Sequence, residues 1–285
     1  MTWRCSGLGW PQEARMAVLR WEGGRVSPLL AGRTLGFRAE GQRGCVGARG
    51  NPCPLGATVP GRVTQARCAE CARLDRAHSV AADTLADDPR TYRVYLAWFG
   101  PGLLKVGITA EERGSSRLLE QGAVVFSWLG RGPLMAARRT EEVLRGALGV
   151  PDRIPYAEKR AVRSGLPEVA DRAAEVEELH RRVLAVGGWN ETLEPLGFAP
   201  VDHAALFGLD GLPTASSVVR ELVPGGAVAG TLLAVAGPDL HLRTAADGHV
   251  VLDTRLMSGW SLVGAEAEAG ISVPTTDLTV QGGLF

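Results

Sequence analysis

Residues 92–109 read Tyr-Arg-Val-Tyr-Leu-Ala-Trp-Phe-Gly-Pro-Gly-Leu-Leu-Lys-Val-Gly-Ile-Thr, and this stretch sets the architecture of the middle of the chain. Two runs rich in aromatic and apolar residues flank the turn Gly100-Pro101-Gly102. Such runs on either side of a glycine- and proline-containing turn are typical of a β-hairpin. We therefore expect two antiparallel strands here.

The residues after the hairpin predict a helix, a strand and a second helix. Ser115-Ser116 can cap a short helix that stops at Gly122. Residues 123–129 form a third apolar run, which predicts a strand. Residues 133–149 open with proline and close with glycine, as helices commonly do. The order strand, strand, helix, strand, helix predicts a small antiparallel sheet flanked by helices.

The C-terminal third has a helical segment followed by β-like segments. Apolar residues keep a helical period over 166–187, which predicts one amphipathic helix. Residues 190–224 have no clear period, and we expect them to link domains or to wrap over a core. A small β-barrel or sheet is predicted from the runs 230–236, 239–244, 249–253 and 260–264 and the hairpin turn Asp247-Gly248.

Composition places the chain among folded globular proteins. Its 285 residues correspond to about two domains. A hydrophobic content of 45% and a charged content of 22% exclude wholesale disorder, a coiled coil and a collagen-like structure. The sequence contains neither an apolar stretch of about 20 residues nor the pattern of a signal peptide. We therefore expect a cytoplasmic protein without a membrane partner.

Four of the five cysteines lie within 27 residues, spaced C-x7-C-x14-C-x2-C. Because disulfides are disfavoured in the cytoplasm, the pattern favours a structural zinc site. The surrounding segment has few large apolar side chains, and a metal ion would supply the missing folding free energy. Unmetallated thiols and an iron–sulfur cluster stay open as alternatives, and His78 is a weaker substitute ligand. The predicted zinc ligands are Cys45, Cys53, Cys68 and Cys71.

The net charge of zero hides an asymmetry along the chain. Residues 1–89 carry 12 arginines against 8 acidic residues, residues 90–163 carry 13 basic against 7, and residues 164–285 carry 6 against 16. A basic first half favours a nucleic-acid partner, because phosphate contacts dominate nucleic-acid affinity. An ordinary solvated surface is the alternative. The acidic second half leaves a protein partner open.

The middle segment resembles the GIY-YIG nuclease superfamily, in its divergent branch with a Lys-(Ile/Val)-Gly-Ile-Thr second strand. Val94-Tyr95-Leu96 would take the place of the first motif and Lys105-Val106-Gly107-Ile108-Thr109 that of the second. A longer match, which includes Arg-Leu-Leu-Glu-Gln-Gly-Ala at 117–123 and Val-Leu-Asp-Thr-Arg-Leu-Met-Ser-Gly at 251–259, resembles an uncharacterised bacterial family of unknown function.

This resemblance implies a metal-dependent endonuclease with four catalytic positions, Tyr95, Lys105, Arg117 and Glu141 or its neighbour Glu142. Glu141 would hold Mg²⁺ or Mn²⁺ on a scissile phosphate oxygen, Arg117 would stabilise the developing charge, and Tyr95 would orient or deprotonate water. Lys105 could contact phosphate. We expect the nucleic acid to be contacted as well by Arg113, Arg138 and Arg139.

Helical spacing distinguishes the two candidate glutamates. Glu141 falls on the apolar stripe that runs through Leu134 and Leu144, whereas Glu142 is displaced by about 100°. An inward-facing carboxylate needs a cation, because an unpaired one would become protonated or destabilise the fold. A divalent metal and an ion pair with Arg117 both satisfy this requirement.

The chain departs from the superfamily pattern in three places. Lys105 replaces the tyrosine of the second motif, and Arg93 replaces the glycine of the first. No asparagine follows the glutamate at the usual distance, and Asp152 is a candidate substitute. Nucleic-acid or protein binding without catalysis is therefore the alternative function.

Together these patterns predict an α+β protein of four parts. Residues 1–89 would contain the zinc module at about 41–78, and residues 90–163 would form the GIY-YIG-like domain. Residues 164–190 would form the amphipathic helix, and residues 191–285 a linker and the C-terminal β domain.

Overall fold

The structure is a computed structural model that describes residues 2–12, 16–76, 88–189, 193–246 and 248–278. It confirms the mixed α+β class, with two sheets in two compact units. Unit 1 contains residues 1–84 and 213–285, and unit 2 contains residues 85–212. Among the described helices, none is long and apolar enough to cross a membrane.

Unit 1 is built on a ten-stranded sheet in the order β15-β10-β13-β12-β11-β4-β14-β1-β2-β3. All neighbouring strands are antiparallel except β10 and β13, which are parallel. The strands are β1 (Trp3–Gly9), β2 (Val18–Trp21), β3 (Val26–Pro28), β4 (Thr34–Glu40), β10 (Ser217–Val219), β11 (Ala227–Ala236), β12 (Asp239–Thr244), β13 (Gly248–Asp253), β14 (Ser261–Gly264) and β15 (Thr275–Asp277). The described helical elements of this unit are α1 (Ala69–Arg76), η4 (Thr254–Leu256) and η5 (Ala267–Ala269).

The two ends of the chain share this sheet, although the sequence predicts them to be separate parts. Strand β4 pairs with β11 on one side and with β14 on the other. Each pairing supplies the inter-strand hydrogen bonds that an isolated strand would lack. The expected C-terminal strands are present as β11 to β14, in a sheet that residues 3–40 complete. Asp247, expected in a hairpin turn, lies outside the described residues.

Unit 2 contains the expected hairpin and a sheet in the order β6-β5-β7-β8, with β9 also paired to β7. Its strands are β5 (Thr91–Trp98), β6 (Leu104–Ala110), β7 (Val125–Pro133), β8 (Glu194–Pro195) and β9 (Val201–Asp202). Its described helical elements are η2 (Glu111–Arg113), α2 (Ser116–Gln121), α3 (Leu134–Leu148), α4 (Tyr156–Val162), η3 (Arg163–Gly165), α5 (Ala174–Ala185) and α6 (Ala204–Phe207).

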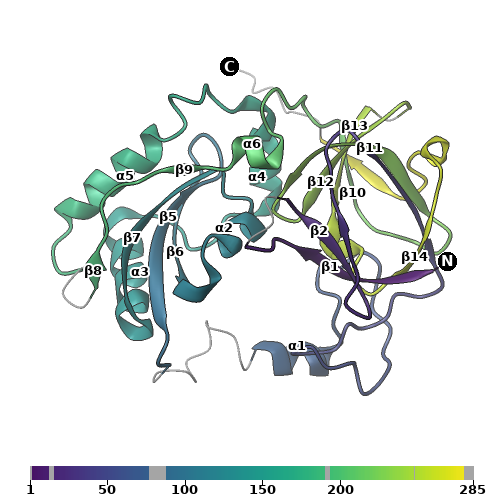
Figure 1. Ribbon diagram of the computed structural model, residues 1–285, viewed down its shortest axis with the longest axis horizontal. Helices are drawn as coiled ribbons and strands as arrows, with labels where there is room; N and C mark the ends of the chain where they lie inside the picture. Colours follow the sequence, from purple (N-terminus) through teal and green to yellow (C-terminus); the bar gives the residue numbers. More distant parts are fainter. Residues whose placement is uncertain (1, 13–15, 77–87, 190–192, 247, 279–285) are drawn as a thin grey trace. The chain divides into compact units, whose positions relative to one another are not determined.

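Helices α3 and α5 pack against β5 and against each other (Figure 1). Helix α5 is shorter than the predicted segment 166–187 because residues 169–173 form turns. There, buried Arg172 donates to the Pro167 carbonyl and pairs with Asp202 and Asp210, so its side chain anchors a turn and not a helix. Unit 2 therefore extends to residue 212, beyond the expected boundary at 163.

Candidate metal centre and candidate active site

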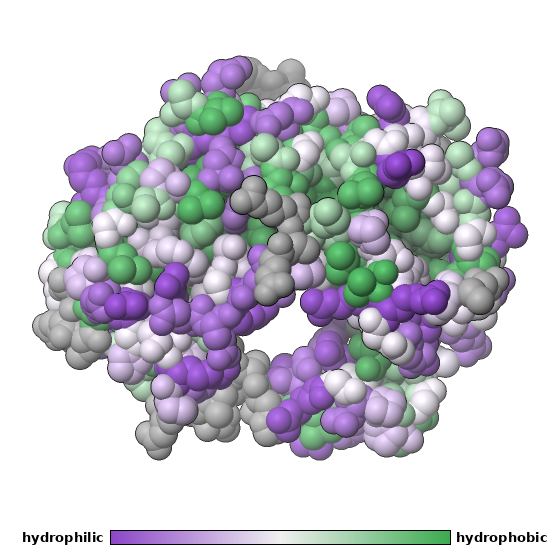
Figure 2. All heavy atoms as spheres, in the orientation of Figure 1, coloured by the Kyte–Doolittle hydropathy of each residue, from purple (hydrophilic) through white to green (hydrophobic). Residues whose placement is uncertain are grey.

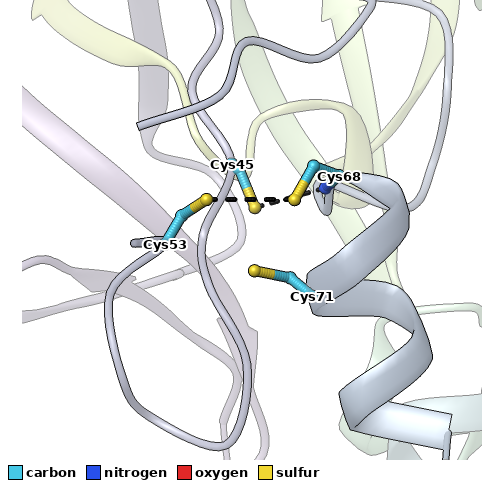
Figure 3. Close-up of side chains that lie close together, drawn as sticks. All are labelled: Cys45, Cys53, Cys68 and Cys71. Carbon is cyan, nitrogen blue, oxygen red and sulfur yellow. Dashed lines mark hydrogen bonds between the residues drawn. The ribbon is translucent and has the colours of Figure 1, made fainter. Parts of the chain in front are cut away.

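The four clustered cysteines converge on one point in unit 1 (Figure 3). Their sulfur atoms all lie within 4.8 Å of one another. Cys68 precedes α1 and Cys71 lies in its first turn, while Cys45 and Cys53 come from the preceding loop. The sulfurs of Cys53 and Cys68 are 3.8 Å apart, close to the separation of about 3.8 Å expected in a tetrahedral site with Zn–S bonds of about 2.3 Å.

Backbone N–H groups point at these sulfurs. The amides of Cys68 and Gly47 donate to Cys45 Sγ at 3.2 and 3.4 Å. A hydrogen bond from the Ala57 amide is the main reason that the pKa of Cys53 falls to about 6. Burial, with the neighbouring sulfurs, raises the pKa of Cys71 to about 12. Several thiolates at such separations repel one another, so the cluster fits a cation.

The surroundings of the cluster also fit a metal ion. Its buried core consists of two of the cysteines together with Ala48 and Val59. So small an apolar core contributes little burial free energy. The four cysteines can therefore hold a metal ion such as zinc. His78, the weaker substitute ligand, lies outside the described residues.

In unit 2, the candidate catalytic residues Tyr95 and Lys105 lie on adjacent strands and are joined by Gln121 of α2. Lys105 Nζ donates to Gln121 Oε1 at 2.7 Å, and Gln121 Nε2 donates to the Tyr95 hydroxyl at 3.0 Å. All three side chains are buried. Gln121 stands in the sequence Arg-Leu-Leu-Glu-Gln-Gly that carried the resemblance, but sequence reasoning gave it no role.

Glu141 of α3 and Arg117 of α2 act electrostatically on the same pair. The pKa of Lys105 is lowered to about 8, mainly by burial and then by the charge of Arg117, while Glu141 opposes the shift. The pKa of Glu141 is raised by burial, and the charge of Lys105 opposes that shift. Burial raises the pKa of Tyr95, and the charge of Arg117 opposes that shift. The four candidate residues thus belong to one electrostatic neighbourhood.

Helix α3 distinguishes the two glutamates as the spacing predicts. Glu141 is half-buried and Glu142 is exposed, although the centre of the buried face is Thr140. In the part of the chain that the structure describes, no basic nitrogen lies within 4.0 Å of the Glu141 carboxylate. Arg117 instead pairs with Glu120 at 3.8 Å. The structure therefore does not contain the Glu141–Arg117 ion pair that was the alternative to a metal.

The remaining candidates border this neighbourhood. Arg113 is paired with Glu120 at 2.7 Å, and its charge opposes the rise in the pKa of Tyr95 that burial causes. Arg138 is half-buried on α3, where its charge opposes the rise in the pKa of Glu141 that burial causes, and Arg139 is exposed. Asp152, the candidate substitute for asparagine, pairs with Arg145 at 3.2 Å and raises the pKa of Glu141.

The charge asymmetry along the sequence does not survive folding. Because the two ends of the chain share unit 1, that unit carries 15 basic and 13 acidic residues, and unit 2 carries 16 and 18. Hydrophilic and apolar residues are interspersed over the face in Figure 2. Segment charge therefore supports neither a basic nucleic-acid-binding half nor an acidic protein-binding half. The cations whose charges act on Glu141 are the remaining observation in favour of an anionic ligand.

A family model described as protein of unknown function (DUF2797) matches residues 32–262. The chain belongs to that family. The DUF2797 match spans both units and includes the cysteine cluster and the Tyr95, Lys105, Arg117 and Glu141 neighbourhood. No curated protein matches the chain. No solved structure matches it either. The resemblance to the GIY-YIG superfamily stays a prediction.

Proposed function

We propose that unit 2 of this DUF2797 protein cleaves phosphodiester bonds in nucleic acid, with a divalent cation held by Glu141. The observation that carries the proposal is the hydrogen-bonded link of Lys105 and Tyr95 through Gln121, with the charges of Arg117 and Glu141 acting on both residues. The four candidate catalytic residues come from two strands and two helices, and sequence motifs indicate all four.

Each residue offers one function that phosphodiester hydrolysis needs. Glu141 is half-buried without a basic partner within 4.0 Å among the described residues, and bound Mg²⁺ or Mn²⁺ would polarise a phosphate oxygen there. Arg117, with a half-exposed side chain, would stabilise charge on a phosphate. Lys105 adds a second cation. The raised pKa of Tyr95 keeps its phenol protonated, so it serves as a hydrogen-bond donor and not as a base.

Binding without cleavage is the second candidate function. Lys105 stands where the superfamily has a tyrosine. Arg113 and Arg117 also pair with Glu120, and Arg145 pairs with Asp152. A site of this kind could hold a phosphate without activating water. Salt-sensitive binding without turnover would identify it.

The cysteine cluster has a separate role in this proposal. Four thiolates would close the coordination shell of zinc and leave no position for a water molecule, so the ion would be structural. Zinc would supply folding free energy to a loop that has little apolar core.

The test compares the zinc-replete full-length protein with its Glu141→Ala and Glu142→Ala variants. Each is incubated with labelled single-stranded, duplex and branched DNA and RNA in Mg²⁺, Mn²⁺ or EDTA. Glu142 is the matched control because it is the exposed neighbour on the same helix. The proposal expects metal-dependent cleavage by the wild type and the Glu142 variant and a loss of at least about 100-fold in the Glu141 variant.

Two outcomes would contradict cleavage. One is the absence of product from every substrate although the protein is folded, in which case gel shifts with the same substrates decide whether nucleic acid is bound. The other is equal cleavage by the Glu141 variant and the wild type, which would place the activity elsewhere.

A further inference from the structure

Both lysines of the chain donate a hydrogen bond to Gln121. The sequence has 31 basic residues, and only Lys105 and Lys159 are lysines. Lys105 Nζ donates to the side-chain oxygen of Gln121 at 2.7 Å, and Lys159 Nζ donates to its main-chain oxygen at 3.0 Å. Both lysines are buried, with 9% and 3% of their surface exposed. Gln121 is thus held at its side chain and at its backbone.

The Lys105 contact determines how the Gln121 amide is oriented. An ammonium group can only donate hydrogen bonds, so the atom facing Lys105 must be Oε1. The amide nitrogen then faces Tyr95, and the tyrosine oxygen is the acceptor of that bond. The hydroxyl proton of Tyr95 is left to point away from Gln121.

The backbone of Gln121 is fixed from the other side by α4. Lys159 Nζ lies 3.9 Å from the ring centre of Phe99 and 4.5 Å from that of Tyr156, which places its charge over two aromatic faces. Gln121 is the last residue of α2, and Gly122 follows in the left-handed conformation with φ 72°. A cation at the carboxyl end of a helix is stabilised by the exposed carbonyls there.

We propose that Gln121 is a positioning residue that makes Tyr95 and Lys105 present hydrogen-bond donors to one oxyanion. This inference rests on the proposed function, because the oxyanion is the phosphate group of the substrate. Tyr95 offers its hydroxyl proton and Lys105 the N–H groups that Gln121 does not use. Gln121 reaches the substrate only through these two residues, and Lys159 holds its main chain.

The first test measures the amine groups directly and needs no activity. Full-length protein with ¹³C,¹⁵N-labelled lysine gives two side-chain signals, assigned with Lys105→Arg and Lys159→Arg. The signals are titrated without divalent cations in the wild type, Gln121→Glu and Gln121→Met. The introduced carboxylate should raise the pKa of Lys105 by about one unit or more, and the loss of the acceptor should lower it.

Lys159 is the internal control, because it binds the main-chain oxygen that both variants retain. Its pKa should change much less than that of Lys105. Equal shifts of both lysines, or no shift of Lys105, would overturn the inference whether or not the protein cleaves nucleic acid. If no substrate is cut but the pKa of Lys105 alone shifts, the hydrogen bonds from Lys105 through Gln121 to Tyr95 are supported and only the proposed cleavage is contradicted.

The second test applies where the wild type cuts a substrate. In Gln121→Glu the introduced carboxylate accepts the Tyr95 proton, so Tyr95 can no longer donate it to the substrate. We expect kcat to fall by about tenfold or more with a smaller change in KM. Tyr95→Phe should reduce kcat in the wild type and cause little further loss in the Gln121→Glu background. Independent, multiplying losses would show that Gln121 does not act through Tyr95.

Discussion

Tyr95 and Gly107 face each other across β5 and β6, and a Cβ atom added at Gly107 would lie 2.4 Å from the Tyr95 hydroxyl oxygen. The glycine of the Lys-Val-Gly-Ile-Thr motif therefore leaves the space in which the tyrosine side chain lies. The two motifs therefore depend on each other. The glycine in β6 leaves the space that allows the Tyr95 hydroxyl of β5 to reach Gln121.

Gly107→Ala is expected to destabilise unit 2 by about 1–3 kcal/mol, because the added methyl group overlaps the Tyr95 ring in a fully packed core. Thermal and denaturant unfolding of the full-length protein measure the loss. Gly146→Ala in α3 is the matched control, because nothing lies within 4 Å of a Cβ at that position. That helix should be stabilised by up to about 1 kcal/mol. Equal stability of the Gly107 variant and the wild type would show that Tyr95 can move aside.

Local patterns in the sequence were sufficient for the hairpin, for α2 and α3, and for the strands β11 to β14. The turn Gly100-Pro101-Gly102 and the terminal Gly149 act on their immediate neighbours, so such features can be read from short windows. The spacing of Glu141 and Glu142 likewise predicted which carboxylate is half-buried.

Pairings between distant segments could not be read in this way. Strand β4 lies between β11 and β14, about 190 and 220 residues later, and no local pattern specifies such partners. The charge asymmetry of the sequence has no counterpart in the folded units for the same reason, because unit 1 combines residues from both ends of the chain. Gln121 was missed because an uncharged amide acquires its role from the two lysines that the fold brings to it.

Purified protein is expected to contain about one zinc ion per chain, and Cys71→Ser should lose it, because the four sulfurs lie within 4.8 Å and form a closed set. Elemental analysis by mass spectrometry measures the content. Removal of the metal with a chelator should lower the melting temperature, because zinc binding contributes folding free energy.

Cys5→Ala is the control for metal content. Cys5 is buried in β1, and burial raises the pKa of its thiol to about 11. It is not one of the four clustered sulfurs, so this variant should keep its zinc. Unchanged zinc content in the Cys71 variant, or iron in place of zinc, would contradict the predicted site.

Arg43 stabilises the loop that carries the cysteines. Its buried guanidinium donates to four backbone carbonyls, at 2.8 Å to Pro60, 2.6 Å to Val63, 2.8 Å to Ser258 and 2.7 Å to Arg255. Arg43→Met should cost more than about 3 kcal/mol, because it leaves these acceptors without their donor.

The matched control for Arg43 is Arg62→Met, an exposed position in the same segment, where a change within about 0.5 kcal/mol is expected. Denaturant unfolding with a fixed excess of zinc compares the two variants. A similar free energy of unfolding for both would show that water replaces the guanidinium.

Acid should weaken unit 2 through His203, whose Nδ1 lies 3.1 Å from the carbonyl oxygen of Ala123 and whose ring packs near the rings of Phe126 and Phe207. Burial lowers the pKa of His203 below its usual 6.5. As the pH falls below about 6.5, the unfolded chain therefore binds a proton that the folded chain does not, and stability decreases. Above that pH the group is neutral in both states and contributes no pH dependence.

His203→Asn keeps a donor for the Ala123 carbonyl and removes the titrating ring, so the loss of melting temperature between pH 7.5 and pH 5.5 should be smaller than in the wild type. His249 of unit 1 has a pKa lowered for the same reason, and His249→Asn should remove a separate part of the loss. The two effects should add, because the residues belong to different units. An undiminished acid sensitivity in the double variant would assign the effect to other groups.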